Sequence, residues 1–299
     1  MLACSERFIA AALAVASVAG LASGQQAGFV LFPSETAEQF EQPPEHRFVH
    51  PVTAPYFHEN SFVTSDVRAW FIYHEFPTDQ LIGGGSATVA AVQARLAITE
   101  WLQLVAYKDG YIDFDTPLVN DDGVGDVGAG LKFAFLRDYE HQWFAAVGVG
   151  YEFPWGDPGV LHNDDEFRLW ASMDKGWGKF HVGGTFNWFI VDGENQDLGN
   201  SDRLSWHLHA DYWLTEWFSP VVEVNGFHVL DAGASPLPFQ GVDVANFGQG
   251  EDDPVITLGL GGEVRPAEDW AFRGAFEVPL TDEDDLYGWR FTMSIVYSF

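Results

Sequence analysis

Apolar and polar side chains alternate strictly, in segments of about ten residues, along the chain from Val63 onward. Successive side chains of a β-strand point to opposite faces, so a period of two predicts strands with one apolar and one polar face. The clearest segment is 203–213. One of its faces carries Leu204, Trp206, Leu208, Ala210 and Tyr212, and the other carries Arg203, Ser205, His207, His209 and Asp211.

The same pattern predicts twelve strands, near 63–75, 87–98, 101–108, 125–136, 142–153, 165–174, 178–190, 202–214, 217–228, 254–265, 269–279 and 287–299. The links between them alternate between five short ones and six long ones rich in Asp, Gly and Pro, the latter at 76–86, 109–124, 154–164, 191–201, 229–253 and 280–286. This alternation is typical of a transmembrane barrel with short periplasmic turns and long outer loops. The predicted fold is all-β: a single antiparallel up-and-down barrel of about twelve strands, ending in Phe299, with both termini in the periplasm.

The region before the barrel divides into two parts. Residues 1–24 contain an apolar stretch after Arg7 and small residues before Gln25, which predicts a secretory signal peptide. Cys4, the only cysteine, would be removed with it, which excludes disulfides and thiol catalysis in the mature chain. Residues 25–62 are interrupted by five prolines and show no period, so we expect a periplasmic arm or a plug; the barrel proper is expected over 63–299.

Charged side chains fall on the polar faces of the predicted strands. An Arg facing lipid at mid-depth costs roughly 2–4 kcal/mol, so we expect the polar faces to line the lumen. A ladder of cross-strand ion pairs is the structural interpretation, and a polar constriction that selects solutes is the functional one. The predicted pore-lining residues are Asp66, Arg68, Arg95, Lys132, Glu152, Arg168, Arg203, His207, His209, Asp211, Glu223, Glu263, Arg265, Arg273, Glu277 and Arg290.

A tryptophan lies beside each of the five short turns. Trp favours a membrane–water boundary, because its ring is apolar and its N–H needs a polar partner. The alternative is a soluble barrel with Trp at its strand edges, but its apolar face would then point at water. We therefore expect an aromatic girdle made of Trp101, Trp143, Trp177, Trp217 and Trp270.

The final strand ends in an aromatic residue preceded by apolar residues at alternate positions. This resembles the C-terminal signal that the barrel-assembly machinery recognises in bacterial outer-membrane proteins, which implies a Gram-negative-type envelope. The residues that carry the resemblance are Phe291, Met293, Ile295, Tyr297 and Phe299.

A second resemblance covers the chain from about Val63 to Phe299. The run 123–135, GVGDVGAGLKFAF, together with Thr99-Glu-Trp-Leu102, resembles the channel family named for the MetA pathway of phenol degradation. That resemblance implies an outer-membrane channel for small, often hydrophobic, compounds. It implies no catalytic residues, and the Pro-rich segment 25–62 departs from the family pattern.

The net charge is strongly negative. Forty-four acidic residues against fourteen Lys and Arg give −30, which excludes nucleic acid as a partner. Much of the excess acid lies in the long links, as in Asp121-Asp122, Asp164-Asp165, 251–253 and 282–285, where carboxylates could loosely bind divalent cations. No other cofactor and no specific metal site is predicted.

The row Ser205, His207, His209 and Asp211 is a candidate for chemistry. A hairpin centred near Gln196 would bring His181 of the preceding strand close to Asp211, and such side chains can bind zinc or attack an ester. A lumen-facing row of polar residues explains the same pattern without chemistry, and no catalytic residue is predicted.

The predicted function is a passive outer-membrane channel or facilitated transporter for small solutes, with membrane lipid, the assembly machinery and the solute as partners. Two alternatives are an outer-membrane enzyme that modifies lipid and a non-conducting structural or adhesive barrel with cation-binding loops. The longest loop, 229–253, is the one expected to fold inward.

Overall fold

A computed structural model of the chain describes residues 28–34, 42–80, 82–108, 110–162, 165–191, 200–234, 243–244, 254–281 and 287–299. The predicted signal peptide and the acidic runs 251–253 and 282–285 lie outside the described residues, as does part of the Pro-rich segment. The strands are β1 (Asp66–Glu75), β2 (Ser86–Ala97), β3 (Leu102–Lys108), β4 (Tyr111–Asp115), β5 (Asn120–Val124), β6 (Val127–Asp138), β7 (Trp143–Phe153), β8 (Glu166–Trp177), β9 (Phe180–Val191), β10 (Asp202–Tyr212), β11 (Phe218–Asp231), β12 (Val255–Ala267), β13 (Trp270–Pro279) and β14 (Trp289–Ser298).

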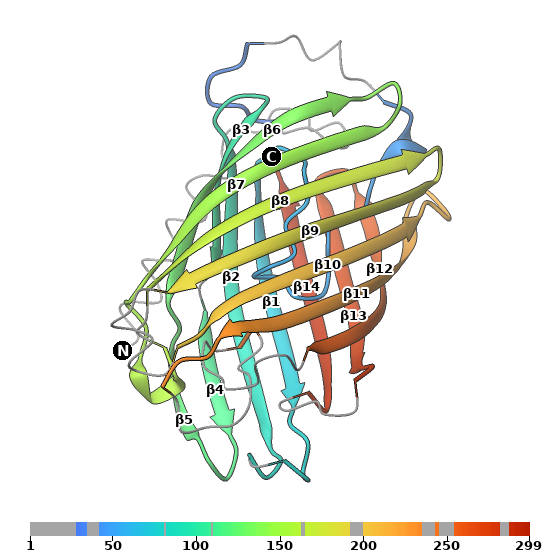
Figure 1. The fold of residues 1–299 in the computed structure, drawn as a ribbon. Helices are drawn as coiled ribbons and strands as arrows, with labels where there is room; N and C mark the ends of the chain where they lie inside the picture. The colour runs from blue at the N-terminus through green and yellow to red at the C-terminus, as the bar shows by residue number, and fades with distance from the viewer. Residues whose placement is uncertain are drawn as a thin grey trace, which may run out of the picture.

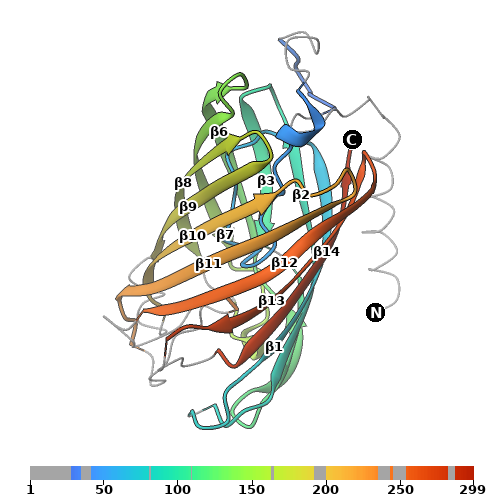
Figure 2. The ribbon, with the colours of Figure 1, turned by 90° about the vertical axis from the view of Figure 1, so that its right-hand side faces the viewer.

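These strands form one closed antiparallel barrel (Figures 1 and 2). From β6 to β14 consecutive strands pair with one another, whereas β3 pairs with β2 and β6, and β4 pairs with β2 and β5. Strand β1 closes the ring by pairing with both β14 and β2, so that Asp66 lies opposite Ser298 and Arg95. The barrel wall has twelve positions, because β4 continues the line of β3 beside β2, and β5 leads into β6. The predicted twelve-stranded barrel is confirmed.

One predicted loop was wrong. The link 109–124 contains β4 and β5, which extend the barrel wall as a hairpin at the end opposite the C-terminus (Figure 1). Its Asp-rich composition hid the alternation, which pairing with the first half of β2 enforces. The break between β3 and β4 lies at Gly110, where φ is +145° and an added Cβ would lie 3.0 Å from Cβ of Ala91. Only glycine adopts this conformation readily, so the strand changes register there.

Helical structure is minor in the described residues. Two 3₁₀ turns occur there, η2 (Pro44–His46) and η3 (Pro158–Val160). No helix in this part of the chain has the length and apolar character needed to cross a bilayer.

The two faces of the strands differ as predicted. In β10 the five side chains of the polar row are buried, whereas Leu208 is 55% exposed on the outside. In β8, Glu166, Arg168 and Asp174 are buried while Met173 is 54% exposed. A one-residue slip would move every inward charge to the outer face, so the register is strongly determined.

Leu208→Arg tests this assignment of faces. We expect the free energy of unfolding to fall by about 2–4 kcal/mol in lipid vesicles, because the guanidinium would face hydrocarbon. Denaturant titration followed by Trp fluorescence measures it, with Leu208→Ala as the control for lost apolar surface. A Leu208→Arg variant no less stable than Leu208→Ala would show that Leu208 does not face lipid.

Candidate functional site: the barrel lumen

The predicted pore-lining residues lie on the inner face of the wall. Fifteen of the sixteen are buried, and Arg265 is half-buried. The space inside the ring of strands also contains residues 48–65, which we call the inner segment; all eighteen are buried. Figures 1 and 2 show this segment threading between the walls of the barrel just before β1. The lumen is therefore lined by the predicted residues and filled by the chain that precedes the first strand.

Glu59 of the inner segment binds two cations of the wall. Its carboxylate accepts hydrogen bonds from Arg95 of β2, with Nη2 to Oε2 at 2.6 Å, and from Lys132 of β6 at 3.1 Å. All three side chains are at most 3% exposed. The backbone carbonyl of Glu59 also accepts hydrogen bonds from the hydroxyls of Ser172 and Thr185. Because burying an unpaired charge is costly, Glu59 and the two wall cations stabilise one another only while the segment is inside.

Wall carboxylates bind the backbone of the inner segment. Glu223 of β11 accepts from the N–H groups of Val52 and Thr53, at 2.9 and 2.6 Å. Asp174 of β8 accepts from the N–H of Ser61 at 2.8 Å. Such charge-assisted bonds satisfy backbone donors that an irregular buried segment would otherwise leave unpaired.

Arg168 of β8 binds the segment through its carbonyl groups. Its Nη1 and Nη2 donate to the carbonyls of Tyr56 and Phe57 at 2.8 and 2.7 Å. Its guanidinium carbon lies 4.7 Å from the ring centroids of both Tyr107 and Trp170. The guanidinium is itself held by two aromatic rings of the wall, and it fixes the middle of the inner segment through these two carbonyl groups.

Neutral amides complete the attachment, and sequence reasoning missed them. The side chains of Gln93, Gln103 and Asn187 donate to the carbonyls of Pro55, Thr64 and Phe57, and Asn225 donates to the hydroxyl of Thr53. Each of these four residues stands at a position of its strand that faces inward, and this alternation could have identified it from the sequence.

The predicted ladder of ion pairs is only partly present. Arg273 lies directly opposite Glu263 on adjacent strands, with Nε to Oε2 at 2.8 Å, and Arg203 reaches Glu166 at 2.6 Å. Arg68 instead pairs with Asp66 on its own strand. The expectation failed because much of the inward charge binds the inner segment or a loop, neither of which strand pairing reveals.

The longest loop reaches the lumen through two described residues, Asp243 and Val244. Asp243 is buried and accepts two hydrogen bonds from Arg290 of β14, at 2.9 and 2.5 Å. Burial alone would raise the pKa of Asp243, but the guanidinium of Arg290 outweighs it and holds the pKa below its usual range. Val244 packs in an apolar cluster with Tyr56 and Phe57 of the inner segment. Val244 therefore packs beside the middle of the inner segment.

The row of polar residues on β10 has the arrangement expected from its register. His181 lies opposite Asp211, with Nδ1 and Oδ1 2.8 Å apart, which confirms the predicted hairpin. The hydroxyl of Ser205 lies 2.9 Å from Nε2 of His207, and Nδ1 of His207 lies 2.8 Å from Oδ1 of Asn225. This is a hydroxyl–imidazole–amide relay.

The relay is enclosed by the inner segment. Its three side chains are at most 1% exposed, and His58 stacks on His207 with ring centroids 5.2 Å apart. In the structure described, neither lipid nor solvent reaches the Ser205 hydroxyl.

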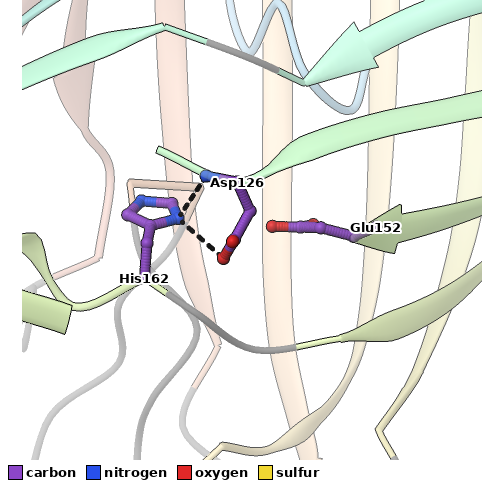
Figure 3. Close-up of side chains that lie close together, drawn as sticks. All are labelled: Asp126, Glu152 and His162. Carbon is purple, nitrogen blue, oxygen red and sulfur yellow. Dashed lines mark hydrogen bonds and ion pairs between the residues drawn. The ribbon is translucent and has the colours of Figure 1, made fainter. Parts of the chain in front are cut away.

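A second polar cluster was not predicted. Asp126, Glu152 and His162 are buried, and their ligand-type atoms all lie within 4.8 Å of one another (Figure 3). Sequence reasoning placed Glu152 in the lumen but did not connect it to Asp126 and His162, which are separated from it in sequence and lie in or beside loops.

The aromatic and C-terminal residues lie on the outside, with one exception. The five predicted girdle tryptophans are 39–60% exposed, and Phe291, Met293 and Ile295 are 38–43% exposed. Tyr297 is half-buried. Phe299 is 5% exposed because Phe29 packs beside it, with ring centroids 6.2 Å apart. Their roles as girdle and assembly signal stay predictions.

Comparison with known proteins identifies the architecture. No protein-family model matches the chain, and no curated protein matches it. Among solved structures, the chain is similar to the COG4313 outer membrane channel from Pseudomonas putida F1, with a TM-score of 0.60 and 13% identity over 84% of this chain and 100% of that one. The NanC porin matches more weakly, with a TM-score of 0.49 and 11% identity over 79% and 98%. At these identities the likeness concerns the fold alone: the chain has the fold of a closed twelve-stranded antiparallel β-barrel, similar to that of the outer membrane channel.

Proposed function

We propose that the chain is an outer-membrane channel for passive diffusion of small solutes, and that its inner segment closes the lumen at rest. The observation that carries the proposal is the continuous burial of residues 48–65 inside a closed barrel. The similarity of the fold to that of the COG4313 outer membrane channel supports the same assignment. We further propose that the protein resides in the outer membrane with both termini in the periplasm, and that Trp101 and its four counterparts form the girdle.

The chemistry of attachment supports a removable closure. The segment is held by ion pairs and hydrogen bonds, such as those of Glu59 with Arg95 and Lys132. When it leaves, these wall charges can be hydrated by the water that replaces it, so the open state is not prohibitively costly. An apolar plug in an apolar lumen would have no such compensation.

The solute class is inferred from the apolar end of the lumen. Trp70 of β1, Phe189 of β9 and Phe227 of β11 are buried there beside Phe57 of the inner segment. Withdrawal of the segment would expose these rings next to the charged part of the lumen. Such a lining suits small hydrophobic or aromatic solutes, as the resemblance to the phenol-degradation channel family also implies.

The enzyme alternative receives less support. A lipid-modifying serine would need access to lipid, whereas Ser205 and His207 face the lumen beneath His58. Phospholipid turnover that His207→Ala abolishes would favour the enzyme. A calcium-dependent rise in melting temperature without any current would favour the adhesive barrel.

Single-channel current in a planar bilayer tests the proposal. For refolded residues 25–299 we expect brief, infrequent openings, and for residues 63–299 a steady and larger conductance. Heat-dependent gel migration verifies that both proteins are folded. Silence from both folded proteins, or equal steady currents from both, would contradict closure by the inner segment.

A further inference from the structure

Three side chains that commonly bind metals meet at the barrel end opposite the C-terminus. Asp126 immediately precedes β6, Glu152 lies near the end of β7, and His162 follows η3. Their exposed fractions are 0, 0 and 6%. Figure 3 shows the carboxyl group of Glu152 directed toward Asp126, whose own carboxyl group lies beside the imidazole of His162. Three separate segments thus contribute to one enclosed cluster.

Neighbouring backbone groups fix the orientation of the His162 ring. Its Nε2 lies 3.0 Å from the carbonyl oxygen of Val244, which can only accept, so Nε2 carries the hydrogen. Its Nδ1 lies 3.3 Å from the backbone nitrogen of Asp126, whose N–H can only donate, so Nδ1 carries no hydrogen; its lone pair accepts this long hydrogen bond, and a bound ion would take the place of the N–H. A metal-binding histidine typically has this arrangement, with its other ring nitrogen donating to a carbonyl.

The distance between His162 and Asp126 fits a shared ion better than a hydrogen bond. Nδ1 lies 3.3 Å from Oδ2 of Asp126, whereas a charged hydrogen bond is usually about 2.7–2.9 Å long. Two ligands about 2.0–2.1 Å from a tetrahedral zinc ion lie roughly 3.3–3.4 Å apart. Oδ1 of Asp126 accepts from the N–H of Gly156 at 2.6 Å, which leaves Oδ2 to face the cluster.

The charge of the surroundings favours a cation. Glu152 lies opposite Glu166 in the pairing of β7 with β8, so three carboxylates lie in this region. Arg203 binds Glu166 at 2.6 Å. Buried carboxylates close to one another are strongly stabilised by a positive charge placed between them.

We propose that Asp126, Glu152 and His162 bind one divalent transition-metal ion, of the zinc or manganese type. An imidazole ligand favours these ions over calcium and magnesium, which prefer oxygen. The ion would hold three chain segments together, and through His162 and Val244 it would fix the longest loop, whose Asp243 binds Arg290. This site is independent of the proposed channel activity.

The proposal is tested by zinc binding to refolded residues 25–299, from which EDTA has first removed any bound metal. Isothermal titration calorimetry should show one Zn²⁺ per chain. We expect Glu152→Gln and His162→Gln to weaken the affinity by at least about tenfold. Asp113→Asn, which changes an exposed carboxylate of β4 at the same barrel end, should bind zinc as the wild type does. Ca²⁺ should bind more weakly than Zn²⁺ to the wild type.

Two outcomes would overturn the site. One is the absence of saturable one-to-one binding to the wild type. The other is equal affinity in the wild type and in folded Glu152→Gln, which would assign the binding to acidic loops. If either variant does not show heat-dependent gel migration and is therefore unfolded, the zinc X-ray absorption spectrum of the wild type tests the site instead. A spectrum without a nitrogen ligand would exclude His162 as a ligand.

Discussion

A double variant with cysteines at positions 53 and 259 is expected to be silent in a planar bilayer when oxidised and to conduct after reduction. An ideal Cβ at Gly259 of β12 lies 3.6 Å from Cβ of Thr53, within the range of about 3.5–4.5 Å that a disulfide requires. The backbone at Gly259 is not in the left-handed region, and an added Cβ would clash with Cγ2 of Thr53, 2.6 Å away, a methyl group that Thr53→Cys removes. The sole natural cysteine, Cys4, lies in the predicted signal peptide and does not compete.

The expected effect of this disulfide is large. A disulfide stabilises by about 2–4 kcal/mol, which corresponds to roughly a 30- to 1,000-fold change in the population of the open state. Thr53→Cys alone and Gly259→Cys alone are the controls, and neither should respond to dithiothreitol. Equal current before and after reduction, in protein whose disulfide is verified by mass spectrometry, would show that the inner segment does not gate the lumen.

The second large effect is expected from Glu59→Ala. In the closed state this substitution leaves Arg95 and Lys132 buried without their shared carboxylate. Removing one partner of a buried ion pair costs about 3–5 kcal/mol, so the open state should gain roughly 100- to 5,000-fold relative to the closed one. The measurement is open probability in the bilayer, and Glu59→Gln should have a smaller effect because the amide still accepts a hydrogen bond.

Glu45→Ala provides the matched control for Glu59→Ala. It removes the same charge from the same N-terminal region but from η2, outside the inner segment. Its open probability should equal that of the wild type. If folded Glu59→Ala also behaves as wild type, the ion pairs of Glu59 do not hold the closed state.

The wall of the barrel was predictable because it depends on a local rule. The period of two predicted that Leu208 points outward and His207 points inward, as the structure shows. A hairpin centred near Gln196 predicted that His181 lies beside Asp211, which the structure also shows. Both follow from pleating and pairing of consecutive strands, which involve only neighbours in the chain. The same rule failed at 109–124, where pairing with β2 imposes strand structure on an Asp-rich sequence.

The contents of the barrel were not predictable in this way. Residues 48–65 have no period, because an irregular segment satisfies its backbone through side chains of distant strands. Glu59, which binds both Arg95 and Lys132, carries no signal in the sequence that distinguishes it from an exposed acid. The cluster of Asp126, Glu152 and His162 likewise depends on how loops fold over the barrel end.

The sequence by itself therefore determined the strands, their faces and the closed antiparallel wall, since alternation and short turns act between adjacent residues and adjacent strands. Only the tertiary structure decided what fills the wall: which inward charges bind the inner segment, which bind one another and which bind the longest loop. The physical reason is that an ion pair or a hydrogen bond depends on distance in space. Glu59 and Lys132 meet at 3.1 Å across 73 positions of sequence.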